Sequence, residues 1–297
     1  MVRRDKAVLV GLVGTGIGAS LSPALHEGEG RAHGLDYTYQ VIDAGERGFG
    51  ADDLPRLLRS ARELGFRGLN VTHPFKQAVV ARLDALSPDA AALAAVNTVV
   101  FDGERAIGHN TDWSGFARSF ALGLPDAATG HVVQLGAGGA GAAVAHAALT
   151  LGVDHLRLVD TDPARSADLT AALAQRFGAD RVCSAERGAL PTLLAEADGL
   201  VNATPMGMAA HPGLPLAAEL LHPQLWVAEV VYRPLRTALL VAAQQAGCRI
   251  LHGGGMAVHQ AADAFRLFTG LEPDAERMLA HLAELTGEPA ATDTTPA

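Results

Sequence analysis

The chain has 297 residues, of which 49% are hydrophobic, and it carries a net charge of −9 with a pI near 5.7. This length predicts a sizeable core divided between two domains. The negative charge argues against a nucleic-acid-binding surface, and no apolar stretch is long enough to span a membrane as a helix. Cys183 and Cys248 form no CxxC or Cys/His spacing. The sequence therefore predicts no metal site and a disulfide-free, cytoplasmic protein.

Short apolar runs in the first part of the chain alternate with amphipathic segments. The first run, AVLVGLVGTGIGA, is interrupted by glycines, which favours a strand over a signal peptide. Capping side chains beside good first-turn residues predict helix starts at Ser22-Pro23, Asp52-Asp53 and Ser87-Pro88. The predicted strands cover residues 7–13, 37–42, 68–72, 97–101 and 106–109.

Lys76 is a candidate acid or base. The chain has two lysines, Lys6 and Lys76, against twenty-one arginines. Desolvation can bring the pKa of a lysine ammonium, unlike that of arginine, toward neutrality. The segment NVTHPFK places Asn70 and Thr72 at a strand end and Lys76 in a first helical turn beyond Pro74. A solvated lysine is the commoner case, but strand ends face the crevice of an open α/β sheet.

Two further strand ends in this region are polar. Asn97-Thr98 follows LAAV, and HNTD at residues 109–112 follows AIG. Asn97 or Asn110 alone could be a turn residue that bonds its own backbone. Because polar strand ends recur, we predict a polar pocket suited to a polyol, within an α/β substrate-binding and catalytic domain over residues 1–112.

A glycine-rich turn begins the second half of the chain. VVQLGAGGAGAAVAHAALTLG, residues 132–152, runs from an apolar strand through Gly136, Gly138 and Gly141 into a helix of small residues. In a dinucleotide site these glycines permit a tight turn, close approach to the pyrophosphate and close helix–strand packing. An ordinary glycine-rich turn is the less favoured alternative, because Asp160 follows nineteen residues after Gly141, where a ribose-binding acid is expected. The predicted cofactor residues here are Gly136, Ala137, Gly138, Gly139, Ala140, Gly141 and Asp160.

Asp160 also predicts which dinucleotide is bound. A carboxylate accepts hydrogen bonds from ribose hydroxyls and repels a 2′-phosphate. We expect Arg165 to lie a full turn into the next helix, which is predicted to start at Asp162-Pro163, rather than beside the ribose. The predicted cofactor is therefore NAD.

The second half predicts a doubly wound parallel sheet of about six strands, a Rossmann domain that binds NAD over residues 113–254. Two last helices, near 255–269 and 274–285, exceed what this sheet needs, so residues 255–286 are expected to pack back onto the first domain. Residues 287–297 lack periodicity and are expected to be disordered. The predicted strands cover residues 131–135, 155–159, 181–184, 199–202, 226–231 and 249–251.

Several segments resemble the shikimate dehydrogenase family, and specifically its NAD-dependent quinate/shikimate branch. With the glycine turn, they are SLSP at 20–23, NVTHPFK at 70–76, AVNT at 95–98, GHNTD at 108–112, NATPMGM at 202–208 and GGGMAVHQAADAF at 253–265. The resemblance implies that Lys76 and Asp112 form the catalytic pair. The substrate contacts it implies are Ser20, Ser22, Thr72, Asn97, Tyr232 and Gln260. The further cofactor residues it implies are Asn202 and Thr204, with Val230 and Gly253 near the nicotinamide.

The implied activity is an NAD-dependent oxidoreductase of the shikimate pathway, in aromatic amino acid biosynthesis. It would interconvert shikimate with 3-dehydroshikimate and quinate with 3-dehydroquinate by hydride transfer. Lys76 would carry the hydroxyl proton, and Asp112 would hold the lysine and a neighbouring substrate hydroxyl. The implied partner is a polyhydroxylated cyclohexane or cyclohexene carboxylate. A homodimer is possible, and neither nucleic acid nor a membrane is expected.

Some residues depart from the common family pattern. His73, His109 and Trp113 resemble the quinate-accepting branch, whereas Ser22 stands where that branch often has threonine, so the preferred acid is left open. On local grounds Ser22 before Pro23 is also a plain helix N-cap. Alternative functions are an aminoshikimate-type or folate-type dehydrogenase and a non-catalytic dinucleotide-sensing module. A sensor does not need the Lys76-Asp112 pair.

Overall fold

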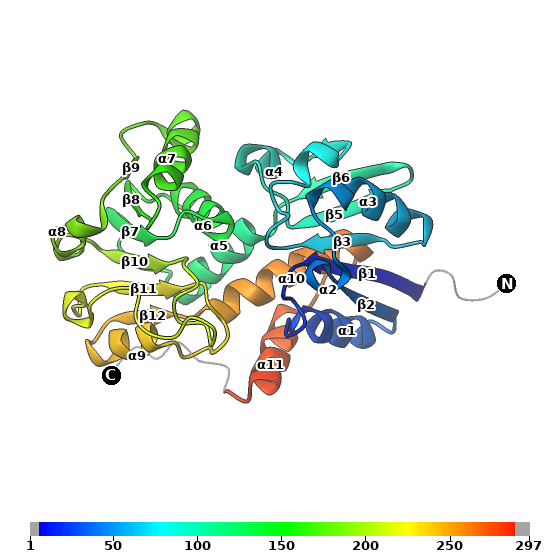
Figure 1. The fold of residues 1–297 in the computed structure, drawn as a ribbon. Coiled ribbons are helices and arrows are strands. Elements are labelled where there is room, and N and C mark those ends of the chain that lie inside the picture. The colour runs from blue at the N-terminus through cyan, green and yellow to red at the C-terminus, as the bar shows by residue number, and fades with distance from the viewer. Residues whose placement is uncertain (1–5, 289–297) are drawn as a thin grey trace. The chain divides into compact units, whose positions relative to one another are not determined.

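The computed structural model of the protein describes residues 6–288 (Figure 1). Two compact units divide the chain. The N-terminal unit contains the described residues up to 114 together with 258–285, and the C-terminal unit contains 115–257 together with 286–288. The chain passes between them within α5 (Asp112–Gly123) and within α10 (Gly253–Thr269). Of the tail expected to be disordered, residues 289–297 lie outside the described residues.

The N-terminal unit contains a mixed six-stranded sheet in the order β2-β1-β3-β5-β6-β4. β1, β2 and β3 are parallel, whereas β5 is antiparallel to both β3 and β6. This reversal brings the start of β5 and the end of β6 to the edge where β3 ends, with Thr98 opposite both Asn70 and His109. The strands are β1 Ala7–Gly14, β2 Asp36–Asp43, β3 Gly68–Val71, β4 Ala85–Leu86, β5 Thr98–Asp102 and β6 Arg105–His109.

Apolar side chains cover both faces of this sheet. Val10 packs in a cluster with Phe265 of α10, and Val13 packs in a second cluster with Leu54 of α3. A strand buried on both faces needs a nearly continuous apolar run, which β1 has. The other helices of this unit are α1 Ser22–Ala32, α2 Ala44–Arg47, α3 Leu54–Glu63, α4 Pro88–Leu93 and α11 Ala275–Thr286, with 3₁₀ turns at 51–53 and 80–82.

The predicted helix starts differ in how they are capped. Ser87 Oγ accepts a hydrogen bond from Ala90 N, and Asp162 Oδ1 caps α7 (Pro163–Phe177) in the same way. At Asp53 the predicted cap is wrong, because a 3₁₀ turn precedes α3 and the Asp53 carboxylate accepts from Gly50 N instead.

The C-terminal unit confirms the predicted doubly wound parallel sheet. Its order is β12-β11-β10-β7-β8-β9, and every pairing is parallel. Leu200 of β10 and Val227 of β11 pack with Leu194 of α8 and Leu239 of α9 in the core of one face. Among the described residues, no helix is both long and apolar enough to cross a membrane. The strands are β7 His131–Leu135, β8 His155–Val159, β9 Val182–Ser184, β10 Gly199–Asn202, β11 Trp226–Glu229 and β12 Arg249–Leu251. The further helices are α6 Gly139–Thr150, α8 Leu190–Ala195 and α9 Ala238–Gln245, with 3₁₀ turns at 187–189 and 218–220.

Candidate active site

A lysine–aspartate ion pair lies at the edge of the N-terminal sheet where β6 ends. Lys76 Nζ is 2.6 Å from Asp112 Oδ2, and the two side chains are 18% and 10% exposed. The other carboxylate oxygen, Asp112 Oδ1, accepts a hydrogen bond of 2.9 Å from Asn97 Nδ2. The carboxylate is therefore held from both sides by donors, one of them charged, which fixes its orientation.

Asn97 is the centre of a buried polar network beneath this pair. Its Oδ1 accepts from Thr111 N at 2.7 Å and from Thr98 Oγ1 at 3.0 Å, and its Nδ2 also donates to Thr111 Oγ1 at 2.9 Å. Buried amides require such partners. The amide orientation is fixed by the backbone donor of Thr111, so Asn97 can present only its NH₂ group to Asp112. Sequence reasoning did not single out Thr111, although it lies in the polar strand end HNTD.

The predicted strand over residues 97–101 corresponds to β5, which begins at Thr98, so Asn97-Thr98 stands where a strand starts and the description of this pair as a strand end is wrong. Asn97 nevertheless reaches Asp112 because β5 runs antiparallel to its neighbours. The start of β5 therefore lies beside the end of β3 and the end of β6. A sequence pattern marks polar residues at strand boundaries, but strand direction depends on pairing between distant segments.

Lys76 does not lie in a first helical turn as predicted. Residues 76–79 form turns that lead into the 3₁₀ turn at 80–82. The Lys76 carbonyl accepts from Val96 N at 2.8 Å, and Val80 N donates to Gln77 O. A helix would need the Lys76 carbonyl to accept from Val80 N, which donates to Gln77 O instead, so the turn does not continue as an α-helix.

Asn110, rather than Asp112, caps α5. Asn110 Oδ1 accepts from Asp112 N at 3.1 Å and from Trp113 N at 3.4 Å, while its Nδ2 donates to Ala95 O. For Asn110 the turn interpretation is therefore correct. Because Asn110 satisfies the first N–H groups of the helix, the Asp112 carboxylate is left for Lys76 and Asn97.

The loop that contains Ser20 and leads to Ser22 is held by a buried carboxylate. Asp43 accepts from Ile17 N at 2.8 Å, Gly16 N at 3.2 Å and Gly45 N at 2.9 Å. The pKa of the Asp43 carboxyl is lowered, and the hydrogen bond from Ile17 N is the main cause. Ser20 Oγ donates to Ser22 Oγ at 3.2 Å.

The N-cap interpretation of Ser22 is wrong. Leu21 occupies the N-cap position, and Ser22 is the first residue of α1. Its hydroxyl is therefore not required to begin the helix. Nearby, Thr72 packs so closely on β1 that a Cβ on Gly14 would lie 2.4 Å from Thr72 Cγ2.

The glycine turn of the C-terminal unit has the geometry of a dinucleotide loop. Gly136 has φ +96°, and a Cβ on Gly141 would lie 2.2 Å from Gly136 O. A Cβ on Gly138 would meet nothing within 4 Å, so the backbone at the start of α6 is open to a ligand. The positive φ, the close packing and the open helix N-terminus are the features that let such a turn hold a pyrophosphate.

Asp160 lies beside this turn and is almost fully buried. Its Oδ2 accepts from Ala137 N at 2.7 Å, and its Oδ1 accepts from Asp162 N at 2.9 Å. Burial raises the pKa of Asp160, but these bonds and the Arg165 charge outweigh burial, so the pKa is lowered. Arg165, expected a full turn into the next helix and away from the ribose, is the third residue of α7, and its Nη1 is 3.3 Å from Asp160 Oδ1, the acid expected to bind the ribose. The long side chain reaches back over the first turn of α7.

The remaining cofactor residues of the resemblance gather where β10 and β11 end. Asn202 is fully buried, and its Oδ1 accepts from Thr204 Oγ1 at 2.7 Å. A Cβ on Gly253 would lie 2.5 Å from Val230 O. Tyr232 follows in the same unit and is half-buried, whereas Gln260 of α10 belongs to the N-terminal unit.

Sequence reasoning missed Glu229, the last residue of β11. Burial raises the pKa of Glu229 to about 7, although hydrogen bonds from Asn202, Val231 and Thr237 oppose the increase. The sequence pattern could have pointed to this residue, because Glu229 is the one acid in the apolar run LWVAEVVY. A charged residue in a strand of this kind is seldom fully buried without partners.

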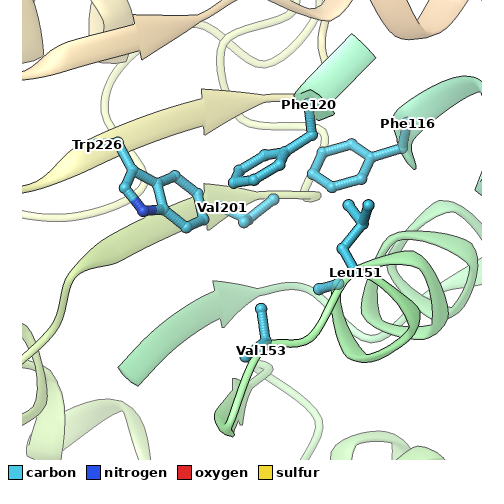
Figure 2. Close-up of a pocket in the computed structure, with 7 residues that line it drawn as sticks. Phe116, Phe120, Leu151, Val153, Val201 and Trp226 are labelled. Atoms are coloured by element: carbon cyan, nitrogen blue, oxygen red, sulfur yellow. The ribbon is translucent and has the colours of Figure 1, made fainter. Parts of the chain in front are cut away.

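A pocket in the C-terminal unit is lined only by apolar side chains, among them Phe116, Phe120 and Trp226 (Figure 2). It lacks the polar groups that orient a hydroxylated acid, so it is a gap in the packing rather than a substrate site. Within residues 6–288, no group of three His, Cys, Asp or Glu side chains is placed to hold a metal ion.

Comparisons with known proteins agree with this arrangement. The model of the shikimate dehydrogenase substrate binding domain matches residues 12–99, and that of the shikimate 5′-dehydrogenase C-terminal domain matches residues 253–282. A shikimate dehydrogenase (NADP⁺) of Streptomyces avermitilis is 63% identical over 94% of this chain and 96% of its own length. A quinate/shikimate dehydrogenase (NAD⁺) of Corynebacterium efficiens is 50% identical over 94% and 99%.

Among solved structures, quinate dehydrogenase from Corynebacterium glutamicum in complex with NAD superposes with a TM-score of 0.88. It is 48% identical, covering 94% of this chain and 99% of that one. Identity at this level extends over nearly the whole length of this chain. The chain therefore belongs to the shikimate dehydrogenase family of nicotinamide-dinucleotide oxidoreductases.

Proposed function

We propose that this protein is an NAD-dependent dehydrogenase that interconverts shikimate with 3-dehydroshikimate and quinate with 3-dehydroquinate. The observation that carries the proposal is the ion pair of 2.6 Å between Lys76 and Asp112, held in place by Asn97. A protein that only sensed the dinucleotide would have no use for a lysine and a carboxylate fixed at a polar sheet edge.

Oxidation of a ring hydroxyl removes a hydride from carbon and a proton from oxygen. NAD, when bound, accepts the hydride. In reduction the Lys76 ammonium donates its proton to the oxygen of the keto group, and in oxidation the neutral amine left by that loss takes the hydroxyl proton back, while Asp112 keeps the nitrogen in one place. The carboxylate of the substrate is bound by the hydroxyls of Ser20 and Ser22, with Thr72, Asn97, Tyr232 and Gln260 as the other assigned contacts.

NAD is favoured over NADP because Asp160 is buried, ionised and placed beside the glycine turn. A 2′-phosphate here would meet a carboxylate. One observation favours NADP: the half-exposed Arg165 guanidinium lies on Asp160 and could turn toward a phosphate. The named relatives divide in the same way, with NADP⁺ for S. avermitilis and NAD⁺ for C. efficiens.

Steady-state kinetics with shikimate, quinate and aminoshikimate, each with NAD and NADP, test this assignment. We expect kcat/KM with NAD to exceed that with NADP, and shikimate to be the better acid, because Ser22 stands where the quinate-accepting branch often has threonine. Lys76→Ala should lower kcat by about 10² or more without changing NAD affinity. Equal turnover by the Lys76→Ala variant, or a preference for aminoshikimate, would contradict the proposal.

A further inference from the structure

We propose that Glu229 is a positioning residue for the nicotinamide half of the cofactor. The inference rests on the proposed function for what the site does, but its evidence is the geometry of one buried carboxylate. Glu229 is 2% exposed, is not among the residues assigned to catalysis or to ligand contact, and ends β11 at the edge of the parallel sheet where ligands bind.

Glu229 binds three separate segments of the C-terminal unit. Its Oε1 accepts from Asn202 Nδ2 at 2.9 Å and from Val231 N at 3.0 Å. Its Oε2 accepts from Thr237 Oγ1 at 3.0 Å, and the same hydroxyl caps α9. One side chain thus connects the end of β10, the residue after β11 and the start of α9.

Through Asn202, this connection extends to the turn after β10. Asn202 Nδ2 donates to Met206 O at 3.0 Å, and Asn202 Oδ1 accepts from both the backbone and the hydroxyl of Thr204. A Cβ on Gly207, at the end of this turn, would lie 3.7 Å from Glu229 Oε2. The shape of the turn therefore depends on where the Glu229 carboxylate holds Asn202.

Val230 and Gly253, which the resemblance places near the nicotinamide, lie next to the segments that Glu229 connects. Val230 directly follows Glu229, and Gly253 packs on the carbonyls of Val230 and Val231, where a Cβ would lie within 2.6 Å of both oxygens. By contrast, none of the hydrogen bonds of Glu229 within residues 6–288 reaches Asp160 or the start of α6, which would bind the adenosine half and the pyrophosphate. A shift of Glu229 should therefore misplace one end of the cofactor more than the other.

Binding of two ligands distinguishes positioning from a general loss of stability. NADH contains the nicotinamide, and ADP-ribose lacks it. In Glu229→Asp the carboxyl group is kept but is withdrawn by one methylene, so it cannot reach Asn202 and Thr237 together. We expect NADH affinity and kcat to fall about tenfold, with an increased primary deuterium isotope effect on hydride transfer, while the Kd for ADP-ribose stays within about twofold.

Glu229→Gln is the second variant. Its amide keeps the size of the side chain and one acceptor oxygen, and its NH₂ group can donate to the Thr237 hydroxyl, so we expect losses of about threefold or less. The control is Glu29→Gln, which removes a buried carboxylate bound to Arg277 in the N-terminal unit. It should lower thermal stability and leave both affinities unchanged.

Parallel weakening of NADH and ADP-ribose in Glu229→Asp, or no change in either affinity, would overturn the inference. Both ligands bind without substrate, so these measurements remain readable if the wild-type protein oxidises neither shikimate nor quinate. A wild-type protein that oxidises neither acid would refute the proposed function. The positioning role of Glu229 would still be decided by how much the substitution weakens NADH binding relative to ADP-ribose binding.

Discussion

The substitution Asp112→Asn tests the chemistry of the ion pair most directly. The carboxylate accepts on both sides, from Lys76 Nζ at 2.6 Å and from Asn97 Nδ2 at 2.9 Å. An asparagine has one acceptor oxygen, so either orientation of its amide sets an NH₂ group against a donor. Asn97 cannot turn over to relieve the conflict, because its Oδ1 accepts from Thr111 N at 2.7 Å.

The magnitude follows from the bond that is lost. A hydrogen bond to a charged group contributes about 1.5–3 kcal/mol, and about 1.4 kcal/mol corresponds to a factor of ten in rate. If the amide oxygen turns to Lys76, the bond to Asn97 is lost; if it turns to Asn97, the lysine loses its partner. We therefore expect kcat to fall by about 10- to 100-fold. Formation of NADH from NAD and shikimate, followed by absorbance, measures it.

The alternative is that Asp112 merely begins α5. Asn110 already accepts from the N–H groups of Asp112 and Trp113, so the substitution should not fray the helix. Ser87→Ala is a matched control, because it removes the cap of α4 and should cost about 1 kcal/mol of stability with unchanged kinetics. If Asp112→Asn behaved like Ser87→Ala, losing stability while kcat stayed within twofold, the catalytic reasoning would be refuted.

Three further predictions concern the loop, the cofactor and the pH dependence. Asp43→Asn removes an acceptor from the loop that holds Ser20, so KM for shikimate should rise with little change in NAD affinity; an unchanged KM would show that the loop keeps its shape without the carboxylate. Asp160→Asn combined with Thr161→Arg should move the preference toward NADP, and a kcat/KM ratio that stays with NAD would contradict the role of Asp160. Burial lowers the pKa of His26 to about 3. Below pH 6.5 the unfolded chain therefore binds a proton at this histidine that the folded protein does not bind. The free energy of unfolding should fall as the pH is lowered, by up to about 1.4 kcal/mol per pH unit from this group. Denaturant titrations at pH 7 and pH 5 should show a smaller loss in His26→Asn than in the wild type, and identical losses would exclude His26 as a source.

Most of the strands and the cofactor turn are predictable from the sequence, because the responsible forces are local. Alternation of apolar runs with amphipathic segments reproduced β7 to β12 with small changes at the boundaries, and side-chain capping at Ser87 and Asp162 involves residues two or three positions away. The glycine turn was readable for the same reason, since the φ of Gly136 and the contact of Gly141 arise within one strand–turn–helix unit.

The tertiary structure decided which polar groups meet. The start of β5, next to Asn97, lies beside the end of β3 because the two strands pair antiparallel, and the distant N–H of Val96 donates to the carbonyl of Lys76. Arg165 reached Asp160 because a long side chain can fold back over a helical turn. Glu229 looked like one acid in an apolar strand until the ends of β10 and α9 supplied its partners. Hydrogen-bond partners from distant segments satisfy buried polar groups, and only the folded chain specifies which segments those are.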